Sequence, residues 1–223
     1  MNYCIYMPNW KNWKVSILIN ILSISGSPVA GSSTDFILKK IADSVITELD
    51  NTFDVNVSFV KLNDLDLKPC FACGEAPSPE FCFYKDDIYK LYNSIAKCDC
   101  LLVGSPIYFD SVTAQLKTLI DRCNCFRPPD YKNIDPDHHF INLMKKLRPG
   151  AMVLVGGERG WFEGARRVMA GYFKWIDVTN EGMIQYCSDD FNKSGTAADD
   201  EKIIDDASQL GRKLAGIIID KNA

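Results

Sequence analysis

One turn of the chain is rich in hydroxyl groups and glycine, and it reads Ser-Gly-Ser-Pro-Val-Ala-Gly-Ser-Ser-Thr over residues 25–34. It lies between an apolar run, residues 15–24, and a helix-like run that begins at Asp35. Backbone N–H groups at the start of a helix have no intrahelical partner, and together with the helix dipole they attract anions. The turn therefore predicts a phosphate site, with an ordinary turn capped by Ser or Thr as the alternative. The candidate residues are Ser25, Ser27, Pro28, Ser32, Ser33 and Thr34.

The same turn contains no Lys and no Arg, so neutral donors alone would have to hold the phosphate. The P-loop pattern with its Lys is absent, and so is the pattern Gly-x-Gly-x-x-Gly. These absences argue against ATP hydrolysis and against a dinucleotide held in the Rossmann manner.

Two further loops follow apolar runs and suit a flat ring. One carries a proline and two aromatic residues after the run 100–104, and these offer planar surfaces. The other carries two glycines after the run 151–155, where a ring edge can approach the backbone closely. Core packing of the aromatic residues and a tight turn at the glycines are the alternatives. The candidates are Ser105, Pro106, Ile107, Tyr108, Phe109, Asp110, Ser111, Gly156, Gly157 and Glu158.

Five apolar runs alternate with helix-like runs along the chain. The predicted strands cover residues 15–23, 55–60, 100–104, 151–155 and 183–187. Right-handed crossovers turn this pattern into a parallel sheet with helices on both faces, in the order 2-1-3-4-5. In that order the loops after strands one, three and four meet at the switch point, where such sheets bind ligands. A phosphate pocket beside a flat-ring pocket at this point suggests FMN.

We interpret residues 14–223 as one domain with a flavodoxin-like fold, a three-layer α/β/α sandwich around a five-stranded parallel sheet. Residues 1–13 form an aromatic-rich extension before it. We expect irregular structure at 63–85 and 126–140, and a short helix at 140–147.

Composition narrows the range of partners. The 223 residues are 47% hydrophobic and carry a formal net charge of −4, so they can build a core but show no basic footprint for nucleic acid. No apolar run in the sequence has the length of a membrane span. The odd number of cysteines, nine, favours a reducing cytoplasm. Lys11 and Lys14 before the run 15–24 imitate a secretion signal, but we interpret that run as the strand that presents the phosphate turn.

Three segments carry a resemblance to a known family. They are the turn 25–34, the cysteine-rich segment that ends in Asp86-Asp87, and most specifically residues 104–122, from Gly-Ser-Pro-Ile-Tyr-Phe-Asp-Ser to Asp-Arg. They resemble the flavodoxin-like NAD(P)H-dependent FMN reductases and iron–sulfur flavoproteins, from about residue 21 to the fifth strand. The resemblance implies FMN bound at a subunit interface of a homodimer or homotetramer.

By the same resemblance, the hydroxyls of the turn hold the phosphate, the loop 105–109 borders the ring, and Gly156 and Gly157 lie near its polar edge. Two positions depart from the family pattern. Val29 stands where a basic residue is common, and Ser33 stands where Asn is common. Both changes are expected to weaken phosphate binding without abolishing it.

Cys70, Cys73 and Cys82 lie in the first irregular stretch. Iron–sulfur members of the family carry four closely spaced cysteines here, and a cubane cluster needs four thiolate ligands. Three interpretations stay open: structural or redox-active thiols left after loss of a cluster, which we favour; a cluster completed by another ligand; and a zinc site. Nothing in the sequence places the Cys-x-Cys pairs at 98–100 and 123–125 near this loop, and we expect them to be buried as small apolar residues.

The function predicted is that of an FMN-dependent oxidoreductase, which takes hydride from NAD(P)H and passes electrons to a quinone, free flavin or small aromatic acceptor. No residue stands out as a general acid or base. Two alternatives remain: a flavodoxin-type or iron–sulfur flavoprotein electron carrier between proteins, and a redox-sensing module that uses the cysteine loop.

Arg127 and Arg159 are candidates for binding the nucleotide's phosphates. We expect Arg166 and Arg167 on an exposed helix face, and the His pair at 138–139 in solvent.

Overall fold

The computed structural model describes residues 17–50, 52–73, 82–126, 147–157, 160–188 and 193–222. Several sequence predictions fall outside these residues: the extension 1–13, Arg127, the His pair at 138–139, Glu158, Arg159, and the helix at 140–147 except for its last residue.

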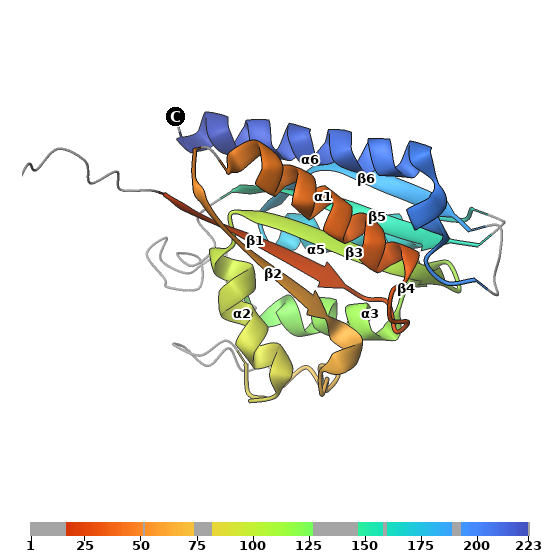
Figure 1. The fold of residues 1–223 in the computed structure, drawn as a ribbon. Helices are drawn as coiled ribbons and strands as arrows, with labels where there is room; N and C mark the ends of the chain where they lie inside the picture. Colours follow the sequence, from red (N-terminus) through yellow and green to blue (C-terminus); the bar gives the residue numbers. More distant parts are fainter. Residues whose placement is uncertain are drawn as a thin grey trace, which may run out of the picture.

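Five parallel strands form the sheet. They are β1 (Leu18–Ser25), β2 (Asp54–Lys61), β3 (Cys100–Tyr108), β5 (Arg148–Gly156) and β6 (Val178–Cys187). Their order, β2-β1-β3-β5-β6, is the predicted one (Figure 1). A short sixth strand, β4 (Ser111–Val112), pairs antiparallel with the end of β3.

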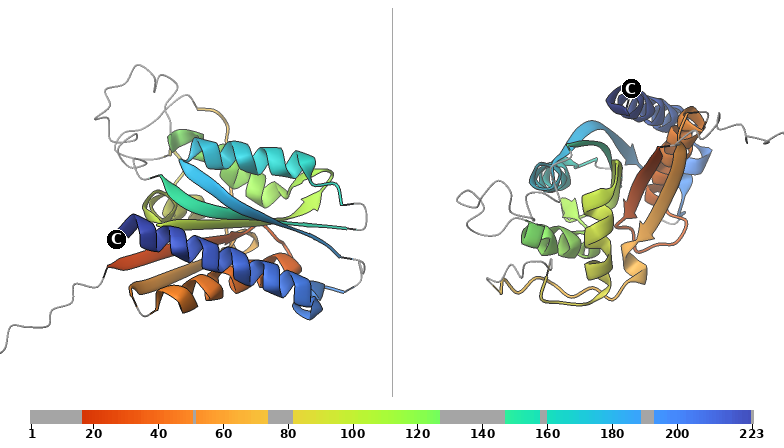
Figure 2. Two further views of the ribbon diagram at one scale, coloured as in Figure 1. Left: turned by 90° about the horizontal axis from the view of Figure 1, so that it is seen from above. Right: turned by 90° about the vertical axis from the view of Figure 1, so that its left-hand side faces the viewer.

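Helices cover both faces of the sheet, which confirms the three-layer α/β/α arrangement (Figures 1 and 2). One face carries α1 (Ser33–Leu49) and α6 (Glu201–Asn222). The other carries α2 (Asp87–Lys97), α3 (Ala114–Arg122) and α5 (Glu163–Trp175). Short 3₁₀ turns are η1 (Leu62–Asp64), η2 (Cys123–Phe126) and η4 (Thr196–Asp199). Within the described ranges, no helix is both long and apolar enough to span a membrane.

The central strand β3 shows why its sequence is apolar at every position. Cys100 and Leu102 belong to the core under α1 and α6, whereas Leu101 and Val103 belong to the core under α2, α3 and α5. A strand that is buried on both faces cannot alternate apolar and polar side chains, so it appears as one continuous apolar run.

The strand β3 is longer than predicted. Residues 105–108 were expected to lie in a loop, and that expectation was wrong: Ser105 and Pro106 continue the pairing with β5, and Tyr108 pairs with Ser111 of β4. Phe109 and Asp110 form the turn of this hairpin with φ values of 51° and 57°. Two consecutive positive φ values are the geometry that two-residue hairpin loops favour.

Candidate functional site

A groove with a volume of about 330 Å³ lies where the carboxyl ends of β1, β3 and β5 meet. This size is at the lower end of the range for small-molecule sites. The three loops singled out in the sequence line it together. The lining residues are Ser27, Val29, Ser32, Ser33, Thr34, Pro106, Ile107, Tyr108, Val155, Gly156, Gly157, Ser188, Lys193, Ser194 and Gly195.

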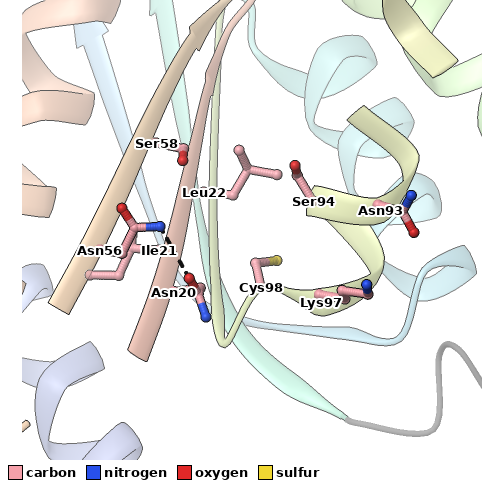
Figure 3. A pocket seen from close by; sticks show the side chains of 9 residues that line it. All are labelled: Asn20, Ile21, Leu22, Asn56, Ser58, Asn93, Ser94, Lys97 and Cys98. Carbon is pink, nitrogen blue, oxygen red and sulfur yellow. Dashed lines mark hydrogen bonds between the residues drawn. The ribbon is translucent and has the colours of Figure 1, made fainter. Parts of the chain in front are cut away.

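A second hollow lies toward the amino ends of the strands, between β1, β2 and α2 (Figure 3). Asn56 donates a hydrogen bond of 3.1 Å to Asn20 at its rim, and Lys97 is the one charged side chain in the set drawn in the figure. Open α/β sheets bind their ligands beyond the carboxyl ends of the strands. We therefore take the groove at the carboxyl ends as the candidate site.

The turn before α1 is held by its own side chains. The Ser32 hydroxyl accepts a bond of 3.2 Å from the Asp35 amide and caps the helix. The Ser25 hydroxyl accepts from the Ser27 amide at 3.2 Å and donates to the Asp35 carboxylate at 2.5 Å. This leaves the amides of Ser33 and Thr34 at the first two helical positions, where N–H groups lack an intrahelical acceptor.

Thr34 supplies the sharpest test of whether a phosphate fits here. Its side chain is buried, its Oγ1 atom has no hydrogen-bond partner among the described residues, and it lines the groove. A buried hydroxyl without a partner costs about 1–3 kcal/mol. Ser33, one residue before, accepts a bond of 3.2 Å from the Ala197 amide, so its hydroxyl proton remains to be donated. These donors fit a ligand that accepts hydrogen bonds, such as a phosphate.

Two lysines from outside the turn supply the positive charge that the turn lacks. Lys61, at the end of β2, places its Nζ atom 2.8 Å from the Val29 carbonyl oxygen and 2.7 Å from the Asp35 carboxylate. Lys193, from the segment after β6, lines the groove and bonds Asp199 at 2.8 Å. The turn itself offers only neutral donors, as predicted, but its surroundings add two positively charged side chains.

The only sequence signal for these lysines lies in the sheet order. Lys61 pairs with Ser25 in the register of β1 and β2, so a lysine at the end of strand two necessarily lies beside the end of strand one. No sequence pattern around Lys193 indicates that it lies near the phosphate turn. Its segment reaches the turn because Gly195, with a φ of 76°, packs so closely that a Cβ atom would lie 2.7 Å from the Gly31 carbonyl oxygen.

The other end of the groove has aromatic and glycine surfaces. Tyr108 is 47% exposed and lines the groove beside Gly156 and Gly157. Phe109, at the hairpin tip, is fully exposed and is not among the lining residues. Core packing therefore does not account for either aromatic side chain.

Several predicted site residues hold the loops instead of lining the groove. The hydroxyl of Ser105 accepts from the Thr113 amide at 3.1 Å, and Thr113 in turn donates to the Gly26 carbonyl at 2.7 Å. Asp110 accepts a bond of 3.1 Å from the amide of Gly164. The predicted residues that do not line the groove are Ser25, Pro28, Ser105, Phe109, Asp110 and Ser111.

Arg166 and Arg167 lie on an exposed face of α5, as expected. Both bond Glu163, at 2.7 and 2.8 Å. The hydrogen bonds from Arg166 and then Arg167 lower the pKa of Glu163 to about 2.

Arg122 ties the two ends of the cysteine loop to the end of α3. Its guanidinium donates to the Lys68 carbonyl at 2.8 Å and to both carboxylate oxygens of Asp86, at 2.7 and 3.0 Å. Cys82, near the second end of the loop, and Cys125 of η2 both pack against the core under α2, α3 and α5.

The described residues around these thiols do not form a metal or iron–sulfur site. Cys70 and Cys73 are exposed, and within the described ranges no three Cys, His, Asp or Glu side chains are grouped closely enough to hold a metal ion. Cys98, Cys100 and Cys123 are buried, as expected. The described residues therefore do not fit a cubane cluster, which needs four thiolates.

Known proteins are similar to this chain in sequence and in fold. Residues 19–187 match the family described as NADPH-dependent FMN reductase. An iron–sulfur flavoprotein of Methanocaldococcus jannaschii is 25% identical over 206 residues, which cover 90% of this chain and 97% of that protein. An iron–sulfur flavoprotein of Methanosarcina thermophila is 28% identical over 166 residues, 74% and 76% of the two chains.

Two solved structures show the same fold. A flavone reductase superposes with a TM-score of 0.62 at 16% identity, over 92% of this chain and 64% of that one. The apo form of an NADH:FMN oxidoreductase superposes with a TM-score of 0.58 at 15% identity, over 88% of each chain.

Proposed function

Because the chain belongs to the NADPH-dependent FMN reductase family, and is a flavin-dependent oxidoreductase that uses FMN, we propose that its groove binds that FMN and that NAD(P)H supplies the hydride. The electrons then pass to a second substrate such as a quinone, free flavin or small aromatic acceptor. The observation that carries the proposal is the buried Oγ1 atom of Thr34, a residue that lines the groove, because this atom has no hydrogen-bond partner among the described residues.

We assign the phosphate to the end of the groove at the start of α1. The amides of Ser33 and Thr34 lack intrahelical acceptors, and the hydroxyls of Ser27, Ser33 and Thr34 line the same surface. Lys193 adds a positive charge within this surface. These groups supply the hydrogen-bond donors that a phosphate needs.

We assign the flat ring to the end lined by Pro106, Tyr108, Gly156 and Gly157. Bound FMN would supply the chemistry, by accepting a hydride and releasing electrons. The chain's own residues hold and orient it: the glycines have no side chain to keep a ring edge from the backbone, and Tyr108 offers a half-exposed flat surface. We propose no proton-transfer role for any side chain that lines the groove.

The test is anaerobic mixing of the FMN-loaded protein with NADPH or NADH, followed by the loss of the flavin's visible absorbance. We expect rapid reduction that saturates with nucleotide concentration. Reduction by dithionite but by neither nucleotide would contradict the hydride-donor proposal and favour an electron carrier. A protein that takes up no FMN would refute the assignment of the groove.

We further propose that residues 14–223 act as one domain that assembles as a homodimer or homotetramer. The full exposure of Phe109 at a hairpin tip beside the groove supports this, because a large apolar side chain in that position is suited to an interface. Light scattering on the eluting protein tests it, and a monomer at all accessible concentrations would refute it.

A further inference from the structure

Asp110 joins the hairpin at the end of β3 to the start of α5. Its carboxylate accepts a hydrogen bond of 3.1 Å from the Gly164 amide, across 54 positions of the sequence. Gly164 is the second residue of α5, so its amide lacks an intrahelical acceptor. Phe162, the residue before the helix, forms no side-chain cap bond with the described residues. Asp110 therefore does for α5 what an N-cap side chain usually does from within the same segment.

The hairpin and the helix also touch through their backbones. A Cβ atom added to Gly164 would overlap the Asp110 carbonyl oxygen and lie 2.7 Å from the Asp110 Oδ2 atom. Any side chain at this position would force the two elements apart. Asp110 has a φ of 57°, in the left-handed region that Asp adopts more readily than most residues. Because Asp110 is exposed, water competes for its carboxylate, and the backbone contact adds to the bond.

The two elements that meet here each support a wall of the groove. Tyr108 lines the groove and lies directly before the two-residue turn to which Asp110 belongs. On the other side, Phe162 packs against Gly156, since a Cβ atom added to that glycine would lie 3.3 Å from the Phe162 ring. Gly156 also lines the groove. The contact between Asp110 and α5 therefore ties together two walls of the end to which we assign the flat ring.

We propose that Asp110 is a positioning residue, which holds Tyr108 and Gly156 in a fixed arrangement around the flavin ring. The inference rests on the proposed function, because it takes the ring to lie at this end of the groove. A ring between two fixed walls keeps one orientation toward the nicotinamide, and transfer steps are sensitive to a displacement of about 1 Å. Asp110 does not line the groove itself, so it acts through the residues that do.

Three substitutions at this position separate the hydrogen bond from the other properties of Asp110. Asparagine keeps an acceptor oxygen on a side chain of the same length, and it also tolerates a positive φ. Alanine removes the acceptor. Glycine removes it as well but suits the positive φ, so a loss that alanine and glycine share is not caused by backbone strain.

The experiment follows the reduction of the FMN-loaded, full-length variants by saturating NADPH or NADH in a stopped-flow instrument. We expect the limiting rate constant to fall about 5- to 20-fold in Asp110→Ala and in Asp110→Gly, and Asp110→Asn to recover most of it. The dissociation constant for FMN should change by a smaller factor than the rate constant, because the phosphate end of the groove is untouched. A merely structural role would not produce this division.

Gly164→Ala tests the same contact from the side of the helix. Its methyl group must push the hairpin tip away, and we expect the same slow reduction. Gly171→Ala, in the same helix, is the matched control, because no described atom lies within 4 Å of the added one. For Asp110→Ala the matched control is Asp87→Ala: this carboxylate also accepts from a backbone amide, that of Asp66 at 3.0 Å, but at the start of α2. Both controls should be reduced at the unchanged rate.

Amide hydrogen exchange at Gly164, read by NMR on the FMN-free protein, needs no turnover. Exchange should be faster in Asp110→Ala, where the amide loses its acceptor, and nearly unchanged in Asp110→Asn. Unaltered exchange in Asp110→Ala would overturn the proposal, and so would reduction of that variant at the unchanged rate. An Asp110→Asn protein as slow as Asp110→Ala would also overturn it, because the bond would then not be the cause. If neither nucleotide reduces the unchanged protein, the proposed function fails instead, and the exchange result still stands.

Discussion

The Nζ atom of Lys61 lies 2.7 Å from the Oδ2 atom of Asp35, in a pair whose side chains are 13% and 6% exposed. Asp35 is bonded at its other oxygen by the Ser25 hydroxyl, and Lys61 also donates to the Val29 carbonyl. The pair therefore joins the end of β2, the phosphate turn and the first turn of α1. It also offsets the negative charge of Asp35 at the place where we propose that a phosphate binds.

Replacing Lys61 by Met keeps the length of the side chain and removes its charge. Asp35 would then repel the phosphate, and we expect the dissociation constant for FMN to rise about 10- to 100-fold. Adding Asp35→Asn to this variant should recover part of the loss. Lys39→Met, on the exposed side of α1, is the control. Titration by quenching of FMN fluorescence gives the constants, and an unchanged value for Lys61→Met would refute the charge argument.

Thr34→Val removes the unpartnered hydroxyl and keeps the shape of the side chain. We expect FMN binding to weaken about 5- to 20-fold, while the free energy of unfolding without FMN stays equal or rises slightly, since a buried unsatisfied group is removed. Thr47→Val, on the same helix, is the matched control, because its hydroxyl bonds the Asp43 carbonyl at 2.9 Å, away from the groove. Equal FMN affinity for Thr34→Val and the unchanged protein would show that this hydroxyl does not contact the ligand.

Gly104→Ala tests how closely α1 approaches β3. An added Cβ atom would lie 2.7 Å from Cγ2 of Thr34 and 2.8 Å from Cδ1 of Leu38, so these side chains or the start of the helix must shift. We expect a loss of about 1–3 kcal/mol in the free energy of unfolding, from overpacking, and weaker FMN binding. In Gly171→Ala nothing lies within 4 Å of the new atom, and a small gain in stability is expected. Urea denaturation compares the two, and a Gly104→Ala protein of full stability would contradict the prediction.

The Arg122–Asp86 pair should make stability sensitive to acid. Burial opposes ionisation of Asp86, but the hydrogen bonds and charge of Arg122 outweigh it and hold the pKa below its ordinary value. A carboxyl whose pKa is lower in the folded state stabilises the protein above the unfolded-state pKa, and this contribution is lost as the pH falls through the folded-state pKa. The loss should therefore begin below about pH 4.

Arg122→Met should lower the free energy of unfolding at neutral pH by about 3–5 kcal/mol, because it leaves Asp86 buried without its partner. Asp86→Asn should flatten the acid-dependent part of the stability curve. Asp87→Asn is the neighbouring control: its partner Lys90 is mostly exposed, and exposed ion pairs contribute little. Thermal unfolding at a series of pH values gives the curves, and an unaltered acid slope in Asp86→Asn would refute the assignment.

The sequence by itself determined the sheet and the position of the groove. A strand buried on both faces must be apolar throughout, so Leu101, Leu102 and Val103 reveal β3 without any knowledge of their neighbours. The start of α1 could also be predicted from the sequence, because hydroxyl side chains commonly cap the first amides of a helix. Ser32 caps α1 in this way. Handedness then sets the strand order, which brings the three loops to one edge.

Only the tertiary structure decided which charged side chains meet. Lys61 reaches Asp35 through the register of two strands, and Arg122 reaches Asp86 across the end of a helix. Each of these contacts joins residues far apart in the chain, and its geometry depends on how elements pack and not on the local pattern of residue types. Hydrophobic periodicity and helix capping are local features of the sequence. The pairing of buried polar groups depends instead on how the helices pack against the sheet.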